Sequence, residues 1–149
     1  MSRLPLSLVA PALAGLALAC GARPALRAGE LRIEPGYANV APTGDGGTAY
    51  FVARNPGALP DTLTSVVVTG AASARVHTMA RTGGMERMTP LDPAVVPAKG
   101  MLQLAPGAAH LMFEGLSRPI RIGDTVVVRL GFARNGSAEL RLAVRPYGG

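Results

Sequence analysis

The sequence predicts a single all-β domain, built as a β-sandwich or barrel. Short apolar runs alternate with turn signals, and 19 Gly and 13 Pro residues are spread along the chain, as expected for many strands joined by tight turns. Beyond the first 19 residues, no stretch long enough for a helix shows apolar residues at 3.6-residue spacing without an interrupting Gly or Pro. A hydrophobic content of 48% is enough to build a core.

The expected strands follow one another through most of the chain. They span residues 31–34, 37–40, 48–54, 63–69, 74–79, 101–104, 109–113, 125–133 and 138–144. Asn135-Gly136 separates the last two and predicts a hairpin with a type I′ turn, because both residue types tolerate a positive φ. Met101 opens an alternating strand, and we expect its side chain in the core.

The N-terminus predicts export from the cytoplasm. Residues 1–19 resemble a secretory signal peptide, with one arginine before an apolar stretch too short for a comfortable membrane span. They end in Ala-Leu-Ala before Cys20, which resembles the lipobox of bacterial lipoproteins. Ordinary cleavage that leaves a free thiol is the alternative, but we favour lipidation of Cys20. Residues 20–30 are then a lipidated, flexible linker, residues 31–149 are the domain, and the protein is periplasmic or on the outer face of the cell membrane.

The charge pattern argues against a nucleic-acid partner. The formal net charge is +6, but the arginines are spread singly, without a basic run or a set of stacking aromatics. A solvated surface explains this pattern better, and we expect a monomer. Cys20 is the only cysteine, so an intramolecular disulfide is impossible.

Histidine and methionine are concentrated in one window, residues 76–113. It contains both histidines and five of the six methionines, the sixth being Met1. His77 and Met79 are two residues apart, and so are His110 and Met112. Residues i and i+2 of a strand point to the same face, about 7 Å apart, so each pair presents an imidazole and a thioether to one side.

The remaining methionines of the window differ in what they predict. Met88 follows the Gly83-Gly84 loop, in a segment between the strands from which it can turn toward the histidines. Met79 and Met85 are possible auxiliary thioethers, although methionine is more often a core filler. A purely structural role explains these residues least well at His77, Met88, His110 and Met112, because both histidines lie beside methionines at strand spacing.

Nitrogen and thioether sulfur indicate a soft metal. Thioethers select Cu(I), and imidazole suits copper generally. Zinc prefers thiolate, imidazole or carboxylate, and Ca²⁺ and Mg²⁺ prefer oxygen. A blue-copper electron carrier needs a thiolate ligand, and the one cysteine lies outside the domain. The donor set therefore favours holding and transferring Cu(I) in an oxidising compartment.

The spacing His77, ten residues, Met88, twenty-one residues, His110, one residue, Met112 resembles the H-x10-M-x21-H-x-M signature of periplasmic PCuAC copper chaperones. Flanking sequences are similar to the family over about residues 31–144: Val-His-Thr-Met at 76–79, Arg-Met-Thr-Pro at 87–90 and Gly-Asp-Thr-Val at 123–126. The resemblance implies a cupredoxin-like Greek-key β-sandwich or barrel that binds Cu(I) through these four residues.

The same resemblance implies a partner. Copper would be delivered to an oxidase subunit, toward the CuA centre of cytochrome c oxidase, alone or with a thiol-bearing assembly protein. The alternative is an extracytoplasmic interaction lipoprotein that uses the sandwich as a scaffold and binds no metal. We expect no enzymatic activity, since the sequence contains no G-x-S-x-G motif and both histidines lie beside methionines.

Overall fold

The fold is built from strands alone in the part of the chain that is described. The structure is a computed structural model, and it describes residues 25–147. In chain order the strands are β1 (Leu26–Ala28), β2 (Leu31–Val40), β3 (Gly46–Arg54), β4 (Asp61–Val68), β5 (Ser73–Thr82), β6 (Met85–Pro90), β7 (Ala94–Val96), β8 (Met101–Leu104), β9 (His110–Glu114), β10 (Thr125–Phe132) and β11 (Gly136–Arg145). No helix in this range is long and apolar enough to cross a bilayer. The prediction of an all-β fold is confirmed.

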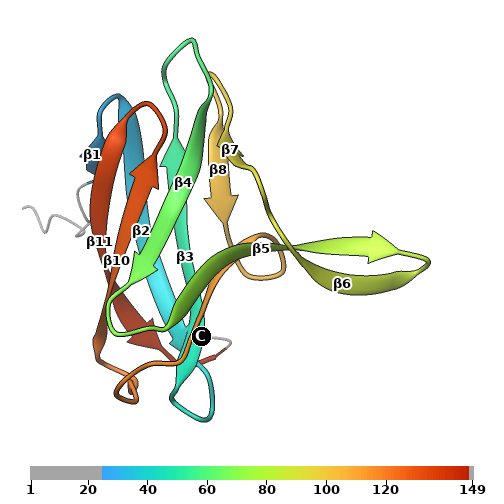
Figure 1. Cartoon of the computed structure of the whole chain (residues 1–149), viewed down its shortest axis with the longest axis vertical. Helices are drawn as coiled ribbons and strands as arrows, with labels where there is room; N and C mark the ends of the chain where they lie inside the picture. Colours follow the sequence, from blue (N-terminus) through green and yellow to red (C-terminus); the bar gives the residue numbers. More distant parts are fainter. Residues whose placement is uncertain (1–24, 148–149) are drawn as a thin grey trace, which may run out of the picture.

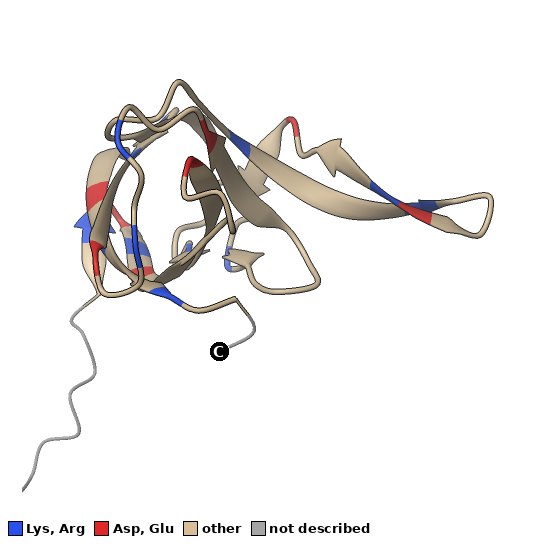
Figure 2. Cartoon of the chain, turned by 90° about the horizontal axis from the view of Figure 1, so that it is seen from below, with Lys and Arg blue, Asp and Glu red and all other residues tan. Residues whose placement is uncertain are grey.

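All strands belong to one sheet that curls on itself. Its order is β6-β5-β9-β3-β2-β11-β10-β4-β7, with β1 added beside β2 and β8 beside β3. The β11–β2 pair is parallel, and the other strand pairs are antiparallel. Figures 1 and 2 show the resulting barrel-like body from the side and from below. The curl lets one face of the sheet enclose the core.

Alternation along each strand decides which side chains enter the core. On β3, Ala49, Phe51 and Ala53 are buried, and on β9 the same holds for Leu111 and Phe113. Every second residue points inward because successive side chains of a strand lie on opposite faces. The alternate residues belong to the outer face of the sheet. They include His110, which precedes the buried Leu111 on β9, and His77, which follows the buried Val76 on β5.

The β5–β6 hairpin projects from the body as an arm (Figures 1 and 2). Thr82 pairs with Met85 across a two-residue loop, and both loop residues are left-handed, with φ of 60° at Gly83 and 79° at Gly84. This geometry is that of a type I′ turn, which matches the twist of a hairpin. The Gly-Gly pair was thus a signal for a strand that the sequence analysis missed.

The domain begins earlier than predicted. Leu26–Ala28 forms β1 and pairs with β2 through Ala28 and Leu31, and Ala28 is 1% exposed. The expectation of a flexible linker through residue 30 is therefore wrong for this part. The predicted signal peptide, residues 1–19, and Cys20 lie outside the described residues. The expected strands 31–34 and 37–40 are one strand with a register shift between Pro35 and Ala38.

The predicted hairpin between β10 and β11 forms, but with a different turn. Phe132 pairs with Gly136, so three residues separate the strands, and Gly136 alone takes a positive φ, 76°. Asn135 instead donates from its backbone N to Asp61 Oδ2 at 3.1 Å and from Nδ2 to the same atom at 2.7 Å. The turn is fixed by a tertiary contact rather than by the intrinsic preference of Asn-Gly.

Asp61 anchors this loop. It is 2% exposed, and its Oδ1 also accepts hydrogen bonds from the backbone N of Thr62 at 2.8 Å and of Arg134 at 3.0 Å. Burial alone would raise the pKa of Asp61, but the hydrogen bonds from the Asn135 side chain and the three backbone N–H groups outweigh burial and lower it. The ionised carboxylate thus holds the β4 and β10–β11 ends together.

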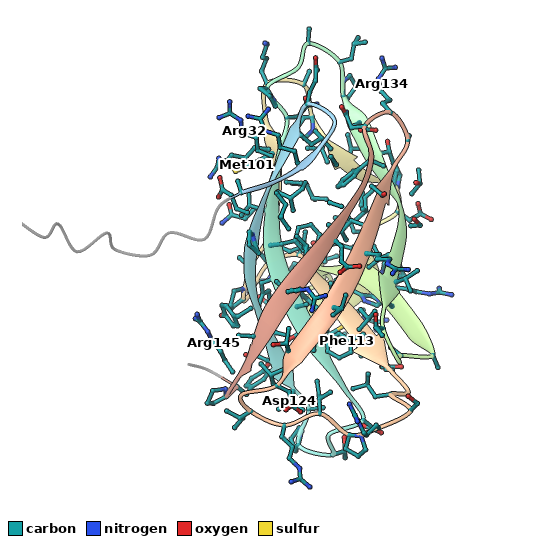
Figure 3. All side chains as sticks on the ribbon, turned by 90° about the vertical axis from the view of Figure 1, so that its left-hand side faces the viewer. Arg32, Met101, Phe113, Asp124, Arg134 and Arg145 are labelled. Carbon is teal, nitrogen blue, oxygen red and sulfur yellow. The ribbon has the colours of Figure 1, made fainter. Side chains whose placement is uncertain are left out.

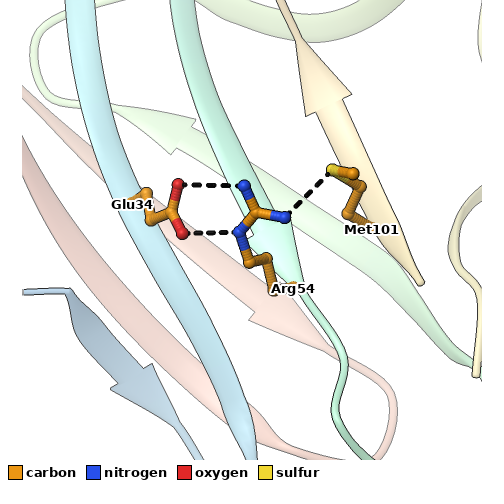
Figure 4. A network of polar contacts seen from close by, with 3 residues as sticks. All are labelled: Glu34, Arg54 and Met101. Atoms are coloured by element: carbon orange, nitrogen blue, oxygen red, sulfur yellow. Dashed lines mark hydrogen bonds and ion pairs between the residues drawn. The ribbon is translucent and has the colours of Figure 1, made fainter. Parts of the chain in front are cut away.

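Met101 was expected in the core, and this is wrong. Its side chain is 45% exposed, whereas Leu102 and Leu104 are buried. Successive residues of a strand point to opposite faces, so a prediction that is off by one residue exchanges the core face with the solvent face. In β8 the two leucines point inward, and Met101 therefore points outward. Arg54 donates from Nη1 to the Met101 sulfur at 3.4 Å and from Nε to Glu34 Oε1 at 2.5 Å (Figure 4).

Candidate metal centre

The two histidines face each other across adjacent strands. β5 and β9 pair in the register Val76–Leu111 and His77–His110. Val76 and Leu111 are buried in the core, so the next residue of each strand lies on the outer face. Met112, two residues after His110, shares that face. Three of the four predicted ligands are therefore brought together by strand register alone.

The geometry of the imidazoles fits a shared metal ion. Their ring centroids are 6.2 Å apart with an interplanar angle of 31°, and an imidazole nitrogen binds a metal at about 2 Å. His110 Nδ1 lies 3.1 Å from the carbonyl oxygen of Ala108. A proton on Nδ1 donated to this oxygen leaves Nε2 with a free electron pair, the arrangement that orients metal-binding histidines.

His77 carries an unusual polar atom. Its Nδ1 is buried and has no hydrogen-bond partner within residues 25–147. A buried nitrogen without a partner costs free energy unless something else satisfies it. A metal ion at this nitrogen would do so.

Met88 reaches the site from a strand, not from a loop. The prediction of a segment between strands is wrong here, because Met88 lies on β6 directly opposite Met79. Pro90 on the same strand is opposite His77, so Met88 is the diagonal neighbour of that histidine on the same face. The Met88 side chain is 49% exposed and the Met79 side chain 38%.

A pocket of about 400 Å³ joins these residues. His77, Met88 and Met112 line it, together with Ser73, Arg75, Pro90 and Glu114. Met112 also lines a second pocket of about 500 Å³, together with residues from the end of β2, the start of β3 and the loop that joins them. Met88 is 49% exposed, whereas His110 is 8% exposed and is not among the residues that line the 400 Å³ pocket.

The two possible auxiliary thioethers differ in their placement. Met79 shares the face of His77 and Met88. Met85 is three residues from Met88 on β6, and it lies at the tip of the arm opposite Thr82, 60% exposed. An odd separation places Met85 on the opposite face of the hairpin. Only Met79 is positioned to add a donor to the pocket.

The donor set fits Cu(I) better than a hard metal ion. The pocket offers imidazole nitrogen and thioether sulfur, which are soft or borderline ligands. Within residues 25–147, no group of three or more His, Cys, Asp or Glu side chains is placed to hold a metal. A metal held here would therefore depend on the methionines.

Arg75 and Glu114 also line the pocket, and neither was predicted as a member of the site. Arg75 is directly opposite Met112, and Glu114 is opposite Ser73. Both follow from continuing the two-residue alternation, backward from His77 and forward from Met112. Their charge at the edge of the pocket had no signal in the composition.

Solved structures with this architecture are PCuAC domains. The chain is similar to "Apo PCuAC domain from PmoF1", with a TM-score of 0.64, 24% identity and coverage of 79% of this chain and 95% of that one. The chain is also similar to "Copper-bound PCuAC domain from PmoF2", with a TM-score of 0.65, 21% identity and coverage of 79% of this chain and 94% of that one. A third similar structure is "Solution structure of CuI-DR1885 from Deinococcus Radiodurans", with a TM-score of 0.61, 25% identity and coverage of 83% of this chain and 82% of that one. The fold is thus the cupredoxin-like β fold of PCuAC domains, as predicted.

A family model also matches most of the chain. The family described as "Putative lipoprotein LpqE-like" covers residues 25–144, and the chain belongs to this LpqE-like family. A relative from Leifsonia xyli subsp. xyli (strain CTCB07), "Putative lipoprotein Lxx21020", is 29% identical over 112 residues, 74% of this chain and 68% of the relative. The lipoprotein description of the family agrees with the prediction of an exported protein anchored by lipid.

Proposed function

We propose that this protein is an extracytoplasmic copper carrier that binds one Cu(I) ion through His77, Met88, His110 and Met112. The observation that supports this most is the direct pairing of His77 with His110, with a buried Nδ1 on His77 that has no hydrogen-bond partner among residues 25–147. Met112 and Met88 line the same pocket as His77. Two nitrogens and two thioether sulfurs form a four-donor set that matches Cu(I).

The site is built for exchange of the ion rather than for its burial. The histidines are set into a rigid sheet, whereas Met88 is half-exposed on the projecting arm. A long, flexible methionine side chain can move aside without disturbing the core. The incoming ligand of an acceptor could then replace one thioether at a time, and the copper would stay Cu(I) throughout.

The acceptor is proposed from the resemblance to PCuAC proteins. It would be an oxidase subunit with a CuA centre, or a thiol-bearing assembly protein. Thiolate is a stronger ligand for Cu(I) than thioether, so transfer from this site to a thiol is downhill. A reconstituted assay measures the transfer of copper to the acceptor with and without this protein. Loading of the acceptor only in the presence of this protein would support the proposed delivery, and equal loading in its absence would refute the proposed delivery.

Membrane attachment through Cys20 is part of the proposal. A diacylated N-terminus would keep the carrier on the outer face of the membrane, where oxidase subunits are assembled. The family description as a lipoprotein supports this placement.

The experiment that tests the copper site is a competition titration. The purified domain is titrated against a chromophoric Cu(I) chelator of known affinity, with Zn(II) as the control metal. We expect withdrawal of one equivalent of Cu(I) and no competition for Zn(II). A domain that leaves all copper on even a weak chelator would instead favour the alternative, a β-sandwich lipoprotein that binds a partner without metal.

A further inference from the structure

Arg75 lies on the rim of the metal centre. It is directly opposite Met112 in the β5–β9 register, and it precedes His77 by two residues on β5. All three side chains therefore leave the same face of the sheet. Arg75 also lines the pocket of about 400 Å³ that His77, Met88 and Met112 share.

The Arg75 guanidinium has no ion-pair partner among the described residues. The four ion pairs within residues 25–147 are Arg54–Glu34, Arg81–Glu86, Arg129–Glu139 and Arg141–Glu139. Glu114 is the one acidic residue that lines the same pocket, but it pairs across the strands with Ser73 and makes no ion pair with Arg75. An exposed, unpaired cation thus stands beside the site proposed for a cationic metal.

The positive charge of Arg75 weakens Cu(I) binding when no anion is bound beside it. A positive charge that lines the same pocket as the proposed ligands repels Cu(I), and the effect is partly screened by water. An anion at Arg75 would remove the repulsion. A guanidinium presents a planar fork of N–H donors that binds a carboxylate through two parallel hydrogen bonds.

We propose that Arg75 binds a carboxylate carried by the molecule that exchanges copper with this site. The inference rests on the proposed function, since it assumes Cu(I) at His77 and its neighbours. The carboxylate pairs with the guanidinium while the partner's metal-binding atoms reach into the pocket beside Met112. Arg75 is thereby a positioning residue, which selects copper donors and acceptors that carry a negative charge next to their ligand atoms.

A matched pair of chelators tests this. Bicinchoninate binds Cu(I) through two ring nitrogens and carries two carboxylates, and its neutral hydroxyethyl bis-amide keeps the nitrogens. The rate of Cu(I) transfer from the loaded protein to each chelator is measured by absorbance. We divide the transfer rate to bicinchoninate by the transfer rate to the neutral chelator. We expect this rate ratio to be at least about fivefold lower in Arg75→Gln than in the wild type. Arg75→Lys, which keeps the charge without the fork, should give an intermediate ratio.

Arg134→Gln is the matched control. Arg134 is exposed in the β10–β11 loop, at one end of the body in Figure 3, and its loss lowers the net charge by the same amount. If Arg134→Gln lowers the ratio as much as Arg75→Gln, or if Arg75→Gln leaves it unchanged, the inference is wrong. Faster transfer to the neutral chelator on addition of free acetate would also overturn it, because the carboxylate would then act without belonging to the exchange partner.

The outcomes separate this inference from the proposed function. Wild-type protein that holds no Cu(I) against the neutral chelator refutes the copper site itself. Wild-type protein that holds Cu(I) and shows the same rate ratio as Arg75→Gln refutes only the role of Arg75. Equal thermal melting of the three variants and the wild type shows that the differences do not arise from unfolding, as expected for exposed side chains.

Discussion

His77 and His110 are direct cross-strand partners on β5 and β9, with ring centroids 6.2 Å apart. They are 33 residues apart in the chain, and only the pairing of these two strands brings them together. The pair is asymmetric: the buried Nδ1 of His77 has no hydrogen-bond partner in the described part of the chain, whereas the Nδ1 of His110 lies 3.1 Å from the carbonyl oxygen of Ala108. A pair arranged in this way is suited to hold a metal ion at the outer face of the sheet.

Replacing Met88 by leucine should weaken Cu(I) binding at least about tenfold, which corresponds to about 1.4 kcal/mol. The substitution removes a thioether from the pocket but keeps the volume of the side chain. Chelator competition measures the affinity. Met101→Leu is the matched control, because Met101 is as exposed as Met88 and contacts Arg54 far from the site. Equal affinities for the two variants would argue that Met88 is no ligand.

The two auxiliary methionines should behave differently from each other. Met79→Leu should weaken Cu(I) binding by a smaller factor than Met88→Leu, about twofold to fivefold, since Met79 lies beside Met88 on the same face. Met85→Leu should leave the affinity unchanged, because Met85 is on the opposite face of the hairpin. The same titration checks both variants. A larger loss with Met85→Leu than with Met79→Leu would show that the arm rearranges when copper binds.

Asp61 should make the stability of the domain depend on pH in the acid range. Its folded-state pKa is lowered, so its contribution is complete above the unfolded-state pKa, about 4, and is lost as the pH falls through the folded-state value. We expect the melting temperature of the wild type to drop between about pH 5 and pH 3 more steeply than that of Asp61→Asn, which cannot titrate.

A second variant measures the size of the Asp61 contribution. Asp61→Ala leaves the backbone N–H groups of Arg134 and Asn135 without an acceptor, and should lower the free energy of unfolding at neutral pH by about 2–3 kcal/mol. Glu139→Ala is a suitable control, because Glu139 makes only exposed ion pairs with Arg129 and Arg141. Denaturant unfolding compares the two. A parallel pH profile for Asp61→Asn and the wild type would contradict the assigned role.

Cys20→Ser should release the protein from the membrane. Without the thiol, no acyl chain can be attached at position 20, and the proposed lipid anchor is lost. Cell fractionation followed by immunoblotting distinguishes the membrane-bound and released forms. Wild-type protein found entirely in the soluble extracytoplasmic fraction would instead indicate ordinary signal-peptide cleavage.

Local patterns carried much of the site prediction. The alternation of His77 with Met79, and of His110 with Met112, placed each pair on one face because a strand has a two-residue period. Arg75 could have been reached by the same counting. Met88 could not be placed on a strand by its own neighbours, since the residues around it are mostly polar and exposed; the Gly83-Gly84 turn was the usable signal.

Other features depended on partners that are distant in the sequence. Met101 and Leu102 both suit an alternating strand, and only packing of Leu102 and Leu104 into the core decided which face was inside. The Asn135-Gly136 turn was changed by the buried carboxylate of Asp61, 74 residues away. Propensity is weak compared with a hydrogen bond to a buried charge, so tertiary contact prevailed.

By itself the sequence determined the all-β class, the shared face of each His–Met pair and the softness of the donor set, because these follow from composition and from a two-residue repeat. The tertiary structure alone decided that His77 stands opposite His110, that Met88 joins them from an extended arm, and that Arg75 on the rim forms no ion pair with another described residue. Strand register is set by core packing along the whole sheet, and no local stretch of sequence contains that information.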